Sequence, residues 1–247
     1  MRVGAVIIGD ELLSGKRQDR HMAFLVEALS ARGMELSFVH FVGDDPELLT
    51  QTFVSTMASR SVVLSFGGIG ATPDDRTRQC LAMAAGATLE RHPEAVGILE
   101  RRFGAEAYPH RIRMTEFPQG ATLIPNPVNE IPGFSYAHHH CVPGFPNMAW
   151  PMIEWVLDTL YPHLHHAAPQ IERRVLIENT PESELIPVME AIIVAYPALR
   201  VSSLPSGKPG CREVELGLRG AAPEVAEAME ALMHALSAQG VAWKALV

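Results

Sequence analysis

The segment "FGGIGATPDDRT", Phe66 to Thr77, joins an apolar run to a helical pattern and contains three glycines and two adjacent aspartates. The run before it, Ser61 to Phe66, is short and mainly apolar, which is typical of a strand buried on both faces. We expect a helix to begin near Pro73, because proline is favoured at the first position of a helix. The segment therefore predicts a strand, a glycine-rich turn and a helix.

The same order of strand and helix precedes this segment twice, in Val3 to Ile8, His21 to Ala31, Leu36 to Val42 and the helix that starts at Asp45. Strands that alternate with helices pair in parallel through right-handed crossovers. The sequence therefore predicts an α/β fold of three layers, in which helices cover both faces of a mostly parallel sheet.

The remaining elements indicate a second domain. Further strands and helices of the first domain are expected at Pro93 to Phe103, Ala121 to Pro127, Gly133 to Tyr136, Cys141 to Val142 and Met152 to Leu160. The proline-bracketed segment Tyr161 to Pro169 then indicates a linker. We expect residues 1–165 to form the first domain. Residues 170–247 show the order strand, helix, strand, strand, helix, which predicts a small α+β domain with its helices on one face of the sheet.

Composition excludes several classes of protein. The 247 residues are 47% hydrophobic and 19% charged, as in a folded globular protein. The net charge of −8 argues against nucleic acid as a partner, because it repels a phosphate backbone. No apolar run has the length of a membrane span, and the N-terminus lacks a signal-peptide core. The three cysteines are widely separated and support no disulfide framework, so we expect a cytoplasmic protein.

Glycines and acids stand at the carboxyl ends of the predicted strands. These pairs are Gly9-Asp10, Gly43-Asp44, Gly67-Gly68 and Pro143-Gly144. Ligands of open parallel sheets bind at this edge, so the strand ends are expected to form one crevice. The glycines at 67, 68 and 70 let several amide groups approach an anion, which predicts contact with a phosphate group. The alternative for Thr72 to Asp75 is a helix capping box that has no ligand.

Acids beside a phosphate site require an explanation. A divalent cation such as Mg²⁺ provides one, since Mg²⁺ binds one or two carboxylates together with phosphate oxygens and waters. In the alternative, some of the acids accept hydrogen bonds from a neutral polar ring, and the glycine segment alone binds the phosphate. Both can hold for one ligand.

Several segments together resemble a known family. "GDELLSGKRQD", "VGDD", "GGIGATPDDRT", "IPNPVNEIPGF" and "VPGFP" resemble the molybdopterin-binding domain of the MoaB/Mog group and, more closely, the N-terminal part of CinA-like proteins. The second domain is similar to the small KH-like domain of the CinA-like proteins. The resemblance implies a Rossmann-like first domain, a molybdopterin or nucleotide ligand, and a homo-oligomer that is either a dimer or a trimer. It implies either Mg-dependent adenylylation of molybdopterin or cleavage of ADP-ribose by a pyrophosphatase.

The resemblance also assigns residues. Asp75 and Asp44 correspond to catalytic and metal-binding positions. The residues expected to contact the ligand are Gly9, Asp10, Glu11, Ser14, Gly43, Gly67, Gly68, Gly70, Thr72, Asp74, Thr77, Pro143 and Gly144. Two positions depart from the family pattern, because Ala71 replaces the usual proline and Met148 stands where a glutamate is common. A binding module without catalysis and an oligomeric scaffold are the alternative functions. The amidase activity of longer CinA proteins is not expected from this sequence.

Two further motifs have ordinary structural interpretations. Consecutive side chains on a strand point to opposite faces, so His138, His139 and His140 are expected in a solvent-facing or hairpin segment and not around one metal ion. "GKPG" at 207–210 lies between two predicted strands, whereas the GxxG loop of an RNA-binding KH domain joins helices. Neither motif therefore predicts a site.

Overall fold

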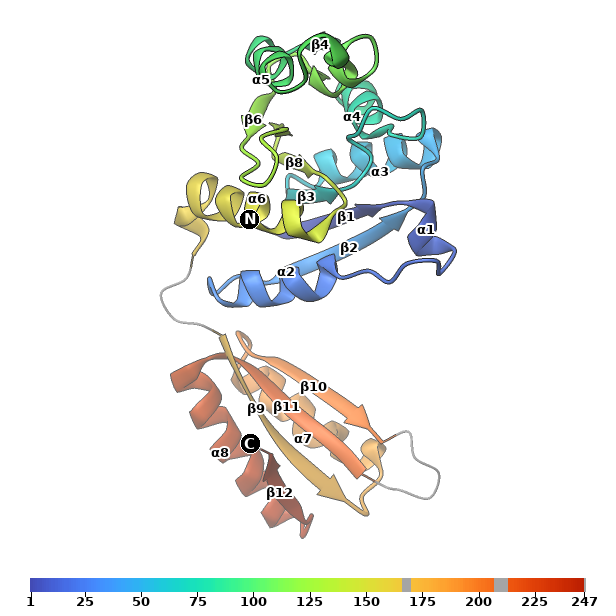
Figure 1. Cartoon of the computed structure of the whole chain (residues 1–247). Helices are drawn as coiled ribbons and strands as arrows, with labels where there is room; N and C mark the ends of the chain where they lie inside the picture. The colour runs from blue at the N-terminus through green and yellow to red at the C-terminus, as the bar shows by residue number, and fades with distance from the viewer. Residues whose placement is uncertain (166–169, 207–212, 247) are drawn as a thin grey trace. The chain divides into compact units, whose positions relative to one another are not determined.

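The computed structural model describes residues 1–165, 170–206 and 213–246. Contacts between residues divide the chain into two units, Met1–His165 and His166–Val247. The first unit contains a six-stranded sheet and a small two-stranded sheet, and the second contains a four-stranded sheet (Figure 1).

The six-stranded sheet has the strand order β2-β1-β3-β8-β7-β6. Its strands are β1 (Val3–Ile8), β2 (Leu36–Val42), β3 (Val62–Phe66), β6 (Thr122–Ile124), β7 (Gly133–Tyr136) and β8 (His139–Val142). β1 pairs in parallel with β2 and β3, and β3 pairs in parallel with β8. β7 pairs antiparallel with both β6 and β8, so it runs opposite to the other five strands of this sheet. The expectation of a mostly parallel sheet is therefore confirmed.

Helices cover both faces of this sheet. Successive residues of a strand point to opposite faces, so alternate residues of β1 contact different helices. Val3, Ala5 and Ile7 of β1 pack against α2 (His21–Ser30) and α6 (Pro146–Leu160). Val6 and Ile8 pack on the other face, toward α3 (Pro46–Ala58), α4 (Thr77–Ala85) and α5 (Pro93–Phe103). The three-layer α/β architecture is confirmed.

The helix expected near Pro73 begins at Thr77 instead. Thr72 to Asp75 forms a turn, in which the Asp75 N–H donates to the Thr72 carbonyl oxygen at 3.1 Å. The Asp75 carboxylate accepts hydrogen bonds from Thr72, as in one half of a capping box, but the chain does not continue as a helix from there. The predicted start of this helix is wrong, because the hydrogen bonds between Thr72 and Asp75 stabilise an isolated turn as well as they stabilise the first turn of a helix.

Short elements between α4 and β6 were not predicted. They are β4 (Leu89–Arg91), the 3₁₀ helices η1 (Gly104–Ala107) and η2 (Arg111–Thr115), and β5 (Glu116–Pro118). β4 and β5 form an antiparallel pair of three residues each. Three residues are too few for a recognisable alternating pattern, so only tertiary pairing defines these strands. The strand expected over Ala121 to Pro127 is also shorter, since β6 covers three residues.

The second unit is an antiparallel sheet with two helices on one face. Its elements are β9 (Gln170–Glu178), α7 (Glu182–Ala195), β10 (Arg200–Pro205), β11 (Glu213–Ala221), α8 (Ala222–Ala238) and β12 (Trp243–Leu246), and its strand order is β10-β11-β9-β12. Alternate residues of β9 and β11 pack with both helices in one core. β12 was not predicted, and the "GKPG" segment lies outside the described residues. No helix in the described ranges is both long and apolar enough to span a bilayer.

The consecutive histidines lie in the hairpin between β7 and β8. His138 is in the turn, with a φ of 63°, whereas His139 and His140 are buried in the strand. Of the two expected placements, a solvent-facing or a hairpin segment, the structure shows the hairpin, with His139 and His140 buried in it. His140 contacts the Tyr161 hydroxyl through Nε2 at 2.7 Å and the Ser135 hydroxyl through Nδ1 at 2.7 Å. Burial lowers the pKa of His140 to about 3, so the folded protein keeps this ring neutral.

Acid should destabilise the first unit partly through His140. Its pKa is about 3 in the folded protein and about 6.5 in an unfolded chain, so protonation below pH 6.5 favours the unfolded state. Between pH 6 and pH 5 this histidine should remove about 1 kcal/mol of the free energy of unfolding. We expect His140→Gln to flatten the pH dependence by that amount in denaturant titrations. Exposed His110→Gln should keep the wild-type slope, and an unchanged slope in His140→Gln would contradict the prediction.

Candidate functional site

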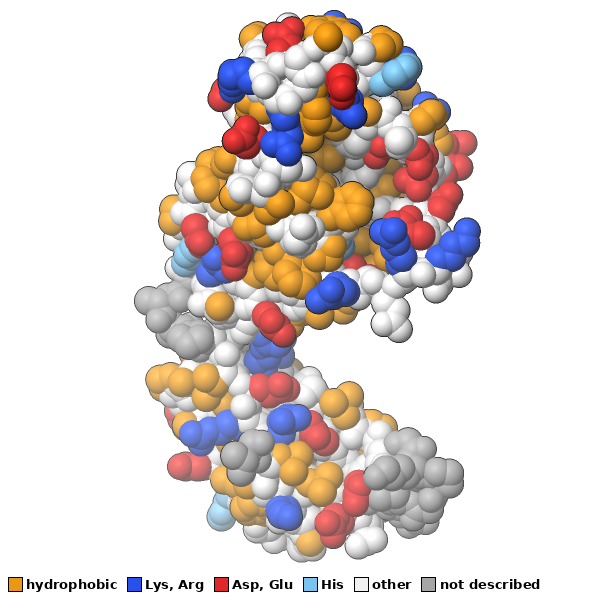
Figure 2. All heavy atoms as spheres, in the orientation of Figure 1, with side chains coloured by type: hydrophobic (Ala, Val, Ile, Leu, Met, Phe, Trp, Pro, Cys, Tyr) orange, Lys and Arg blue, Asp and Glu red, His pale blue; other side chains and the backbone are white. Residues whose placement is uncertain are grey.

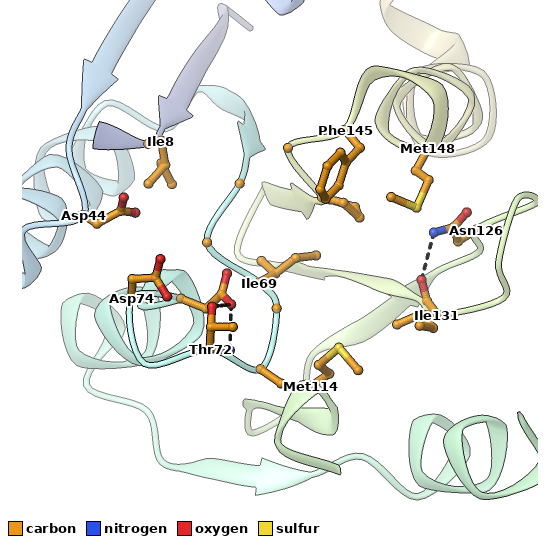
Figure 3. Close-up of a pocket in the computed structure, with 18 of the residues that line it drawn as sticks. Ile8, Asp44, Ile69, Thr72, Asp74, Met114, Asn126, Ile131, Phe145 and Met148 are labelled. Carbon is orange, nitrogen blue, oxygen red and sulfur yellow. Dashed lines mark hydrogen bonds between the residues drawn. The ribbon is translucent and has the colours of Figure 1, made fainter. Parts of the chain in front are cut away.

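The carboxyl ends of β1, β2, β3 and β8 meet at one cavity of about 480 Å³. Ile8 and Gly9 follow β1 into it, Asp44 follows β2, and the loop from Gly67 to Asp75 follows β3. Residues after β8 and from the loop between β6 and β7 form the opposite wall (Figure 3). This volume lies within the range of small-molecule sites.

Two glycines allow the loop after β3 to take its path. Gly67 has a φ of 97°, and a Cβ there would lie 2.5 Å from the Ile8 carbonyl oxygen. Gly68 has a φ of 68°, and its Cβ would lie 2.3 Å from Thr77 Oγ1. Thr77 donates its hydroxyl to the Gly67 carbonyl oxygen at 2.9 Å and its N–H to the Gly68 carbonyl oxygen at 3.0 Å. Thr77 therefore stabilises the loop through two of its carbonyl groups and does not line the cavity.

Arg78 fixes the next part of the same loop. The residue is 2% exposed, and its guanidinium donates to the carbonyl oxygens of Ile69 and Gly70, the latter at 2.6 Å. In a trans peptide the N–H points opposite to the carbonyl, so the N–H groups of Gly70 and Ala71 point away from Arg78. Gly70 and Ala71 line the cavity and Arg78 does not. Burial lowers the pKa of Arg78, and the charge of Asp75 opposes this effect.

The acids after β1 and β2 bind each other through the backbone. Asp10 N–H donates to Asp44 Oδ2 at 3.1 Å, and Asp44 N–H donates to Asp10 Oδ1 at 3.0 Å. Desolvation raises the pKa of Asp44, and the negative charges of Asp10, Glu11 and Asp74 raise it further. The carboxylates of three loops are therefore close enough to repel one another.

Asp75 lies on the glycine loop itself. Its Oδ2 accepts hydrogen bonds from the Thr72 N–H at 2.9 Å and from the Thr72 hydroxyl at 2.5 Å. A Cβ at Gly70 would approach Asp75 Oδ2 to 2.4 Å. Because position 70 has no side chain, the Asp75 carboxylate has room to pack against the loop.

Most of the predicted site residues line the cavity. These are Gly9, Glu11, Asp44, Gly67, Gly68, Gly70, Thr72, Asp74, Asp75, Pro143 and Gly144. Four others, Asp10, Ser14, Gly43 and Thr77, are not in its lining. Asp10 instead supports Asp44, and Gly43 leaves room for the Asp10 carboxylate, which a Cβ at 43 would approach to 2.5 Å. Ser14 is exposed beyond the short helix α1 (Asp10–Leu13).

Of the wall opposite the glycine loop, Pro143 and Gly144 after β8 were predicted as site residues, whereas the loop between β6 and β7 was not. Asn126, with 4% exposed, accepts from the Val128 N–H at 3.0 Å and donates to the Ile131 carbonyl oxygen at 3.1 Å (Figure 3). Asn129 donates to Met148 Sδ at 3.1 Å. Other lining residues are Arg17 and the apolar residues Ile8, Ile69, Ala71, Met114, Ile131, Pro132, Phe145 and Met148. The repeated prolines and asparagines of "IPNPVNEIPGF" were the available signal for this wall.

The carboxylates that line the cavity are suitable ligands for a divalent cation. Four carboxylates, those of Glu11, Asp44, Asp74 and Asp75, line it, and Figure 2 shows acidic side chains on the side of the first unit where α1, α3 and α4 lie. In the part of the chain that the structure describes, no three His, Cys, Asp or Glu side chains gather as a ready-made metal site. A cation would therefore need phosphate or water oxygens as further ligands, as Mg²⁺ commonly has.

Comparison with known proteins assigns the family. Residues 4–166 match the family described as "probable molybdopterin binding domain", and this match covers more than half of the chain. The chain belongs to this family. All residues that line the cavity fall within the matched range.

Relatives of the molybdopterin-binding family match beyond this range. A protein of Pyrobaculum calidifontis is 30% identical over 209 residues, which are 82% of this chain and 80% of the relative. A CinA-like protein of Anaeromyxobacter sp. is 32% identical over 200 residues, which are 77% of this chain and 49% of the relative. The chain thus spans about half the length of that CinA-like protein. The structure of the protein CinA from Thermoplasma acidophilum, 24% identical, covers 64% of this chain and 98% of its own with a TM-score of 0.59, which shows the same fold.

Gly68→Ala should damage the site more than a matched glycine substitution elsewhere. Gly86 has a similar φ of 64° with no atom within 4 Å of its Cβ, whereas a Cβ at Gly68 would clash with Thr77. Gly86→Ala should cost about 1 kcal/mol of stability, from backbone strain alone. We expect Gly68→Ala to cost clearly more in urea denaturation. Equal losses in the two variants would show that the contact with Thr77 does not constrain the loop.

Asp44→Asn should stabilise the ligand-free protein at pH 7. The pKa of Asp44 is raised in the folded state, so its ionised form weakens folding once the pH exceeds that pKa. The amide removes the charge and can still accept the hydrogen bond from Asp10. We expect a melting temperature about 2 °C higher, with the difference shrinking as the pH is lowered into the ordinary range for aspartate.

Asp45→Asn is the control for this substitution. Asp45 caps α3 by accepting from the Leu48 N–H at 2.8 Å, and asparagine caps a helix equally well. This variant should melt like the wild type. A lower melting temperature in Asp44→Asn would contradict the repulsion between the acids.

Proposed function

We propose that the first unit binds a phosphorylated pterin or nucleotide in this cavity, and that it acts on the phosphoryl group with the help of a divalent cation. One observation carries the proposal, namely that a glycine loop with fixed carbonyl groups and the carboxylates of Asp44 and Asp75 line the same cavity. Membership of the molybdopterin-binding family supports the class of ligand.

The phosphate would bind beside the glycine loop. Because Thr77 and Arg78 hold the carbonyl groups of Gly67 to Gly70 from behind, the following N–H groups are free to donate toward the cavity. Preorganised N–H groups stabilise an anion without any cost of reorientation. Arg17, which also lines the cavity, would supply a positive charge.

The ring of the ligand would lie against the opposite wall. Ile131, Phe145 and Met148 give this wall an apolar surface on which a planar ring packs favourably. Both asparagine side chains of the wall already bond within it, Asn126 to its own loop and Asn129 to Met148. They fix the shape of the wall.

Asp44 and Asp75 would hold the cation, with Asp74 nearby. Bound there, Mg²⁺ would neutralise the charge of the phosphate oxygens and of the leaving group. The raised pKa of Asp44 fits this role, because a cation relieves the repulsion among the acids. The hydrogen bonds from Thr72 keep the Asp75 carboxylate oriented. Transfer of a phosphoryl or nucleotidyl group needs mainly such positioning and charge stabilisation, so both a pyrophosphatase and a nucleotidyltransferase suit these residues.

A binding module without catalysis is the second candidate, and Met148 favours it. Its sulfur accepts a hydrogen bond from Asn129 in the cavity wall, where a glutamate was expected from the family pattern. A thioether neither binds Mg²⁺ well nor removes a proton. An assembly of identical subunits, either a dimer or a trimer, and a cytoplasmic location stay predictions from the sequence.

The proposal is tested by titrating ATP, ADP-ribose and molybdopterin into the protein with and without Mg²⁺, and by assaying turnover. Wild type should bind at least one of them in a Mg²⁺-dependent manner. Asp75→Asn should weaken that binding about tenfold, or about 1.4 kcal/mol. The amide can still accept from Thr72, so the loop should keep its shape. Asp45→Asn, outside the cavity lining, is the matched control.

The outcomes separate the candidates. Turnover that Asp75→Asn abolishes supports the enzyme, and binding without turnover in the wild type supports the module. Full activity of Asp75→Asn would exclude the catalytic role of this residue, and the absence of binding by all three compounds would exclude the proposed ligand class.

A further inference from the structure

His21 is buried at the start of α2 and contacts three other elements of the first unit. The residue is 5% exposed and does not line the cavity of the proposed function. Its ring stacks on Phe66 at the end of β3, with the ring centroids 4.3 Å apart. Its Nε2 lies 3.1 Å from the carbonyl oxygen of Gly144 after β8, and its Nδ1 lies 3.3 Å from Nε1 of Trp150 in α6. Both ring nitrogens therefore have a partner, and the ring is held in one orientation.

These contacts determine which ring nitrogen of His21 carries the proton. Burial lowers the pKa of His21 more than its bond to Gly144 raises it, so the ring is neutral at pH 7 and has one N–H group. An indole nitrogen can only donate, so Nδ1 must accept from Trp150. The proton is therefore on Nε2, and this N–H group donates to the Gly144 carbonyl oxygen.

The hydrogen bond from His21 fixes the peptide that joins Gly144 to Phe145. This peptide is trans, so its N–H group points opposite to its carbonyl group and away from His21. The Phe145 N–H has no hydrogen-bond partner among the residues that the structure describes. Gly144 and Phe145 both line the cavity, where Phe145 lies on the same side as Met148 (Figure 3). The Phe145 N–H is therefore available to a ligand in the cavity.

The same peptide lies directly beside the glycine loop. A Cβ at Gly144 would lie 3.4 Å from the Cα of Gly67, which is ordinary van der Waals contact. The Gly67 N–H donates to the Val142 carbonyl oxygen at 3.0 Å, so the two chain segments are joined just before this contact. The Phe145 N–H therefore borders the part of the cavity in which the glycine loop begins.

We propose that His21 is a positioning residue for the phosphate group of the ligand, which acts through the peptide between Gly144 and Phe145. This inference rests on the proposed function. By holding the Gly144 carbonyl, His21 orients the Phe145 N–H toward the phosphate, as Arg78 does for the N–H groups of the glycine loop. The phosphate then accepts hydrogen bonds from two neighbouring segments, and preorganised donors bind an anion without a cost of reorientation.

The test compares two amide side chains at position 21. Glutamine places its nitrogen near the position of Nε2, so His21→Gln can keep the bond to Gly144. The shorter asparagine reaches only the position of Nδ1, so His21→Asn loses this bond. Both variants lose the ring that stacks on Phe66, so they should melt at similar temperatures, below that of the wild type. A difference between their affinities therefore reports on the bond to Gly144 and not on packing.

The affinities are measured by titrating ATP, ADP-ribose and molybdopterin with Mg²⁺ into the whole chain. A compound that binds the wild type should bind His21→Gln within about threefold of the wild-type affinity and His21→Asn about tenfold more weakly. NMR spectra of the ¹⁵N-labelled wild type supply a second measurement that needs no variant. They should show the His21 proton on Nε2, and the bound compound should shift the amide signal of Phe145 together with those of Gly70 and Ala71.

The outcomes separate the role of His21 from the proposed function. Equal affinities of the two variants, a His21 proton on Nδ1, or shifts of Gly70 and Ala71 without Phe145 would overturn the role of His21 and leave the proposed function intact. If none of the three compounds shifts the amide signals of Gly70 and Ala71, the proposed function fails, and this inference fails with it.

Discussion

The loop between β3 and α4 depends on hydrogen bonds donated to its carbonyl groups by the helix that follows it. Thr77 binds the carbonyl of Gly67, and the buried guanidinium of Arg78 binds those of Ile69 and Gly70. A loop whose carbonyls are held on one side presents its N–H groups on the other. The glycines are required because side chains at 67 and 68 would collide with Ile8 and Thr77. Loop, helix and strand thus form one rigid unit at the edge of the sheet.

Repulsion among the acids opposes stability at the same edge. Desolvation raises the pKa of Asp44, and the negative charges of Asp10, Glu11 and Asp74 raise it further, although the hydrogen bond from the Asp10 N–H lowers it. Functional sites commonly retain such like charges because a bound ligand of opposite charge offsets their repulsion. The energetic pattern therefore agrees with the proposed cation and phosphate.

The end of the loop that begins at Gly67 also lines a second, smaller cavity of about 240 Å³ at the start of α4. Ala71, Thr72 and Asp75 line both cavities. All residues of both cavities belong to the first unit and to the range that matches the family.

The sequence by itself determined the alternation of strands and helices, the glycines at the strand ends and the family, because hydrophobic periodicity and turn residues are local signals. It also indicated Asp44 and Asp75 as lining residues. Only the tertiary structure decided that Thr77 and Arg78 hold the carbonyl groups of the loop after β3. It also decided that Asp10 hydrogen-bonds to Asp44 and that the loop between β6 and β7 forms part of the opposite wall. These roles depend on which segments lie side by side. A local pattern cannot report this, since the partners are far apart in the chain or face away from the cavity.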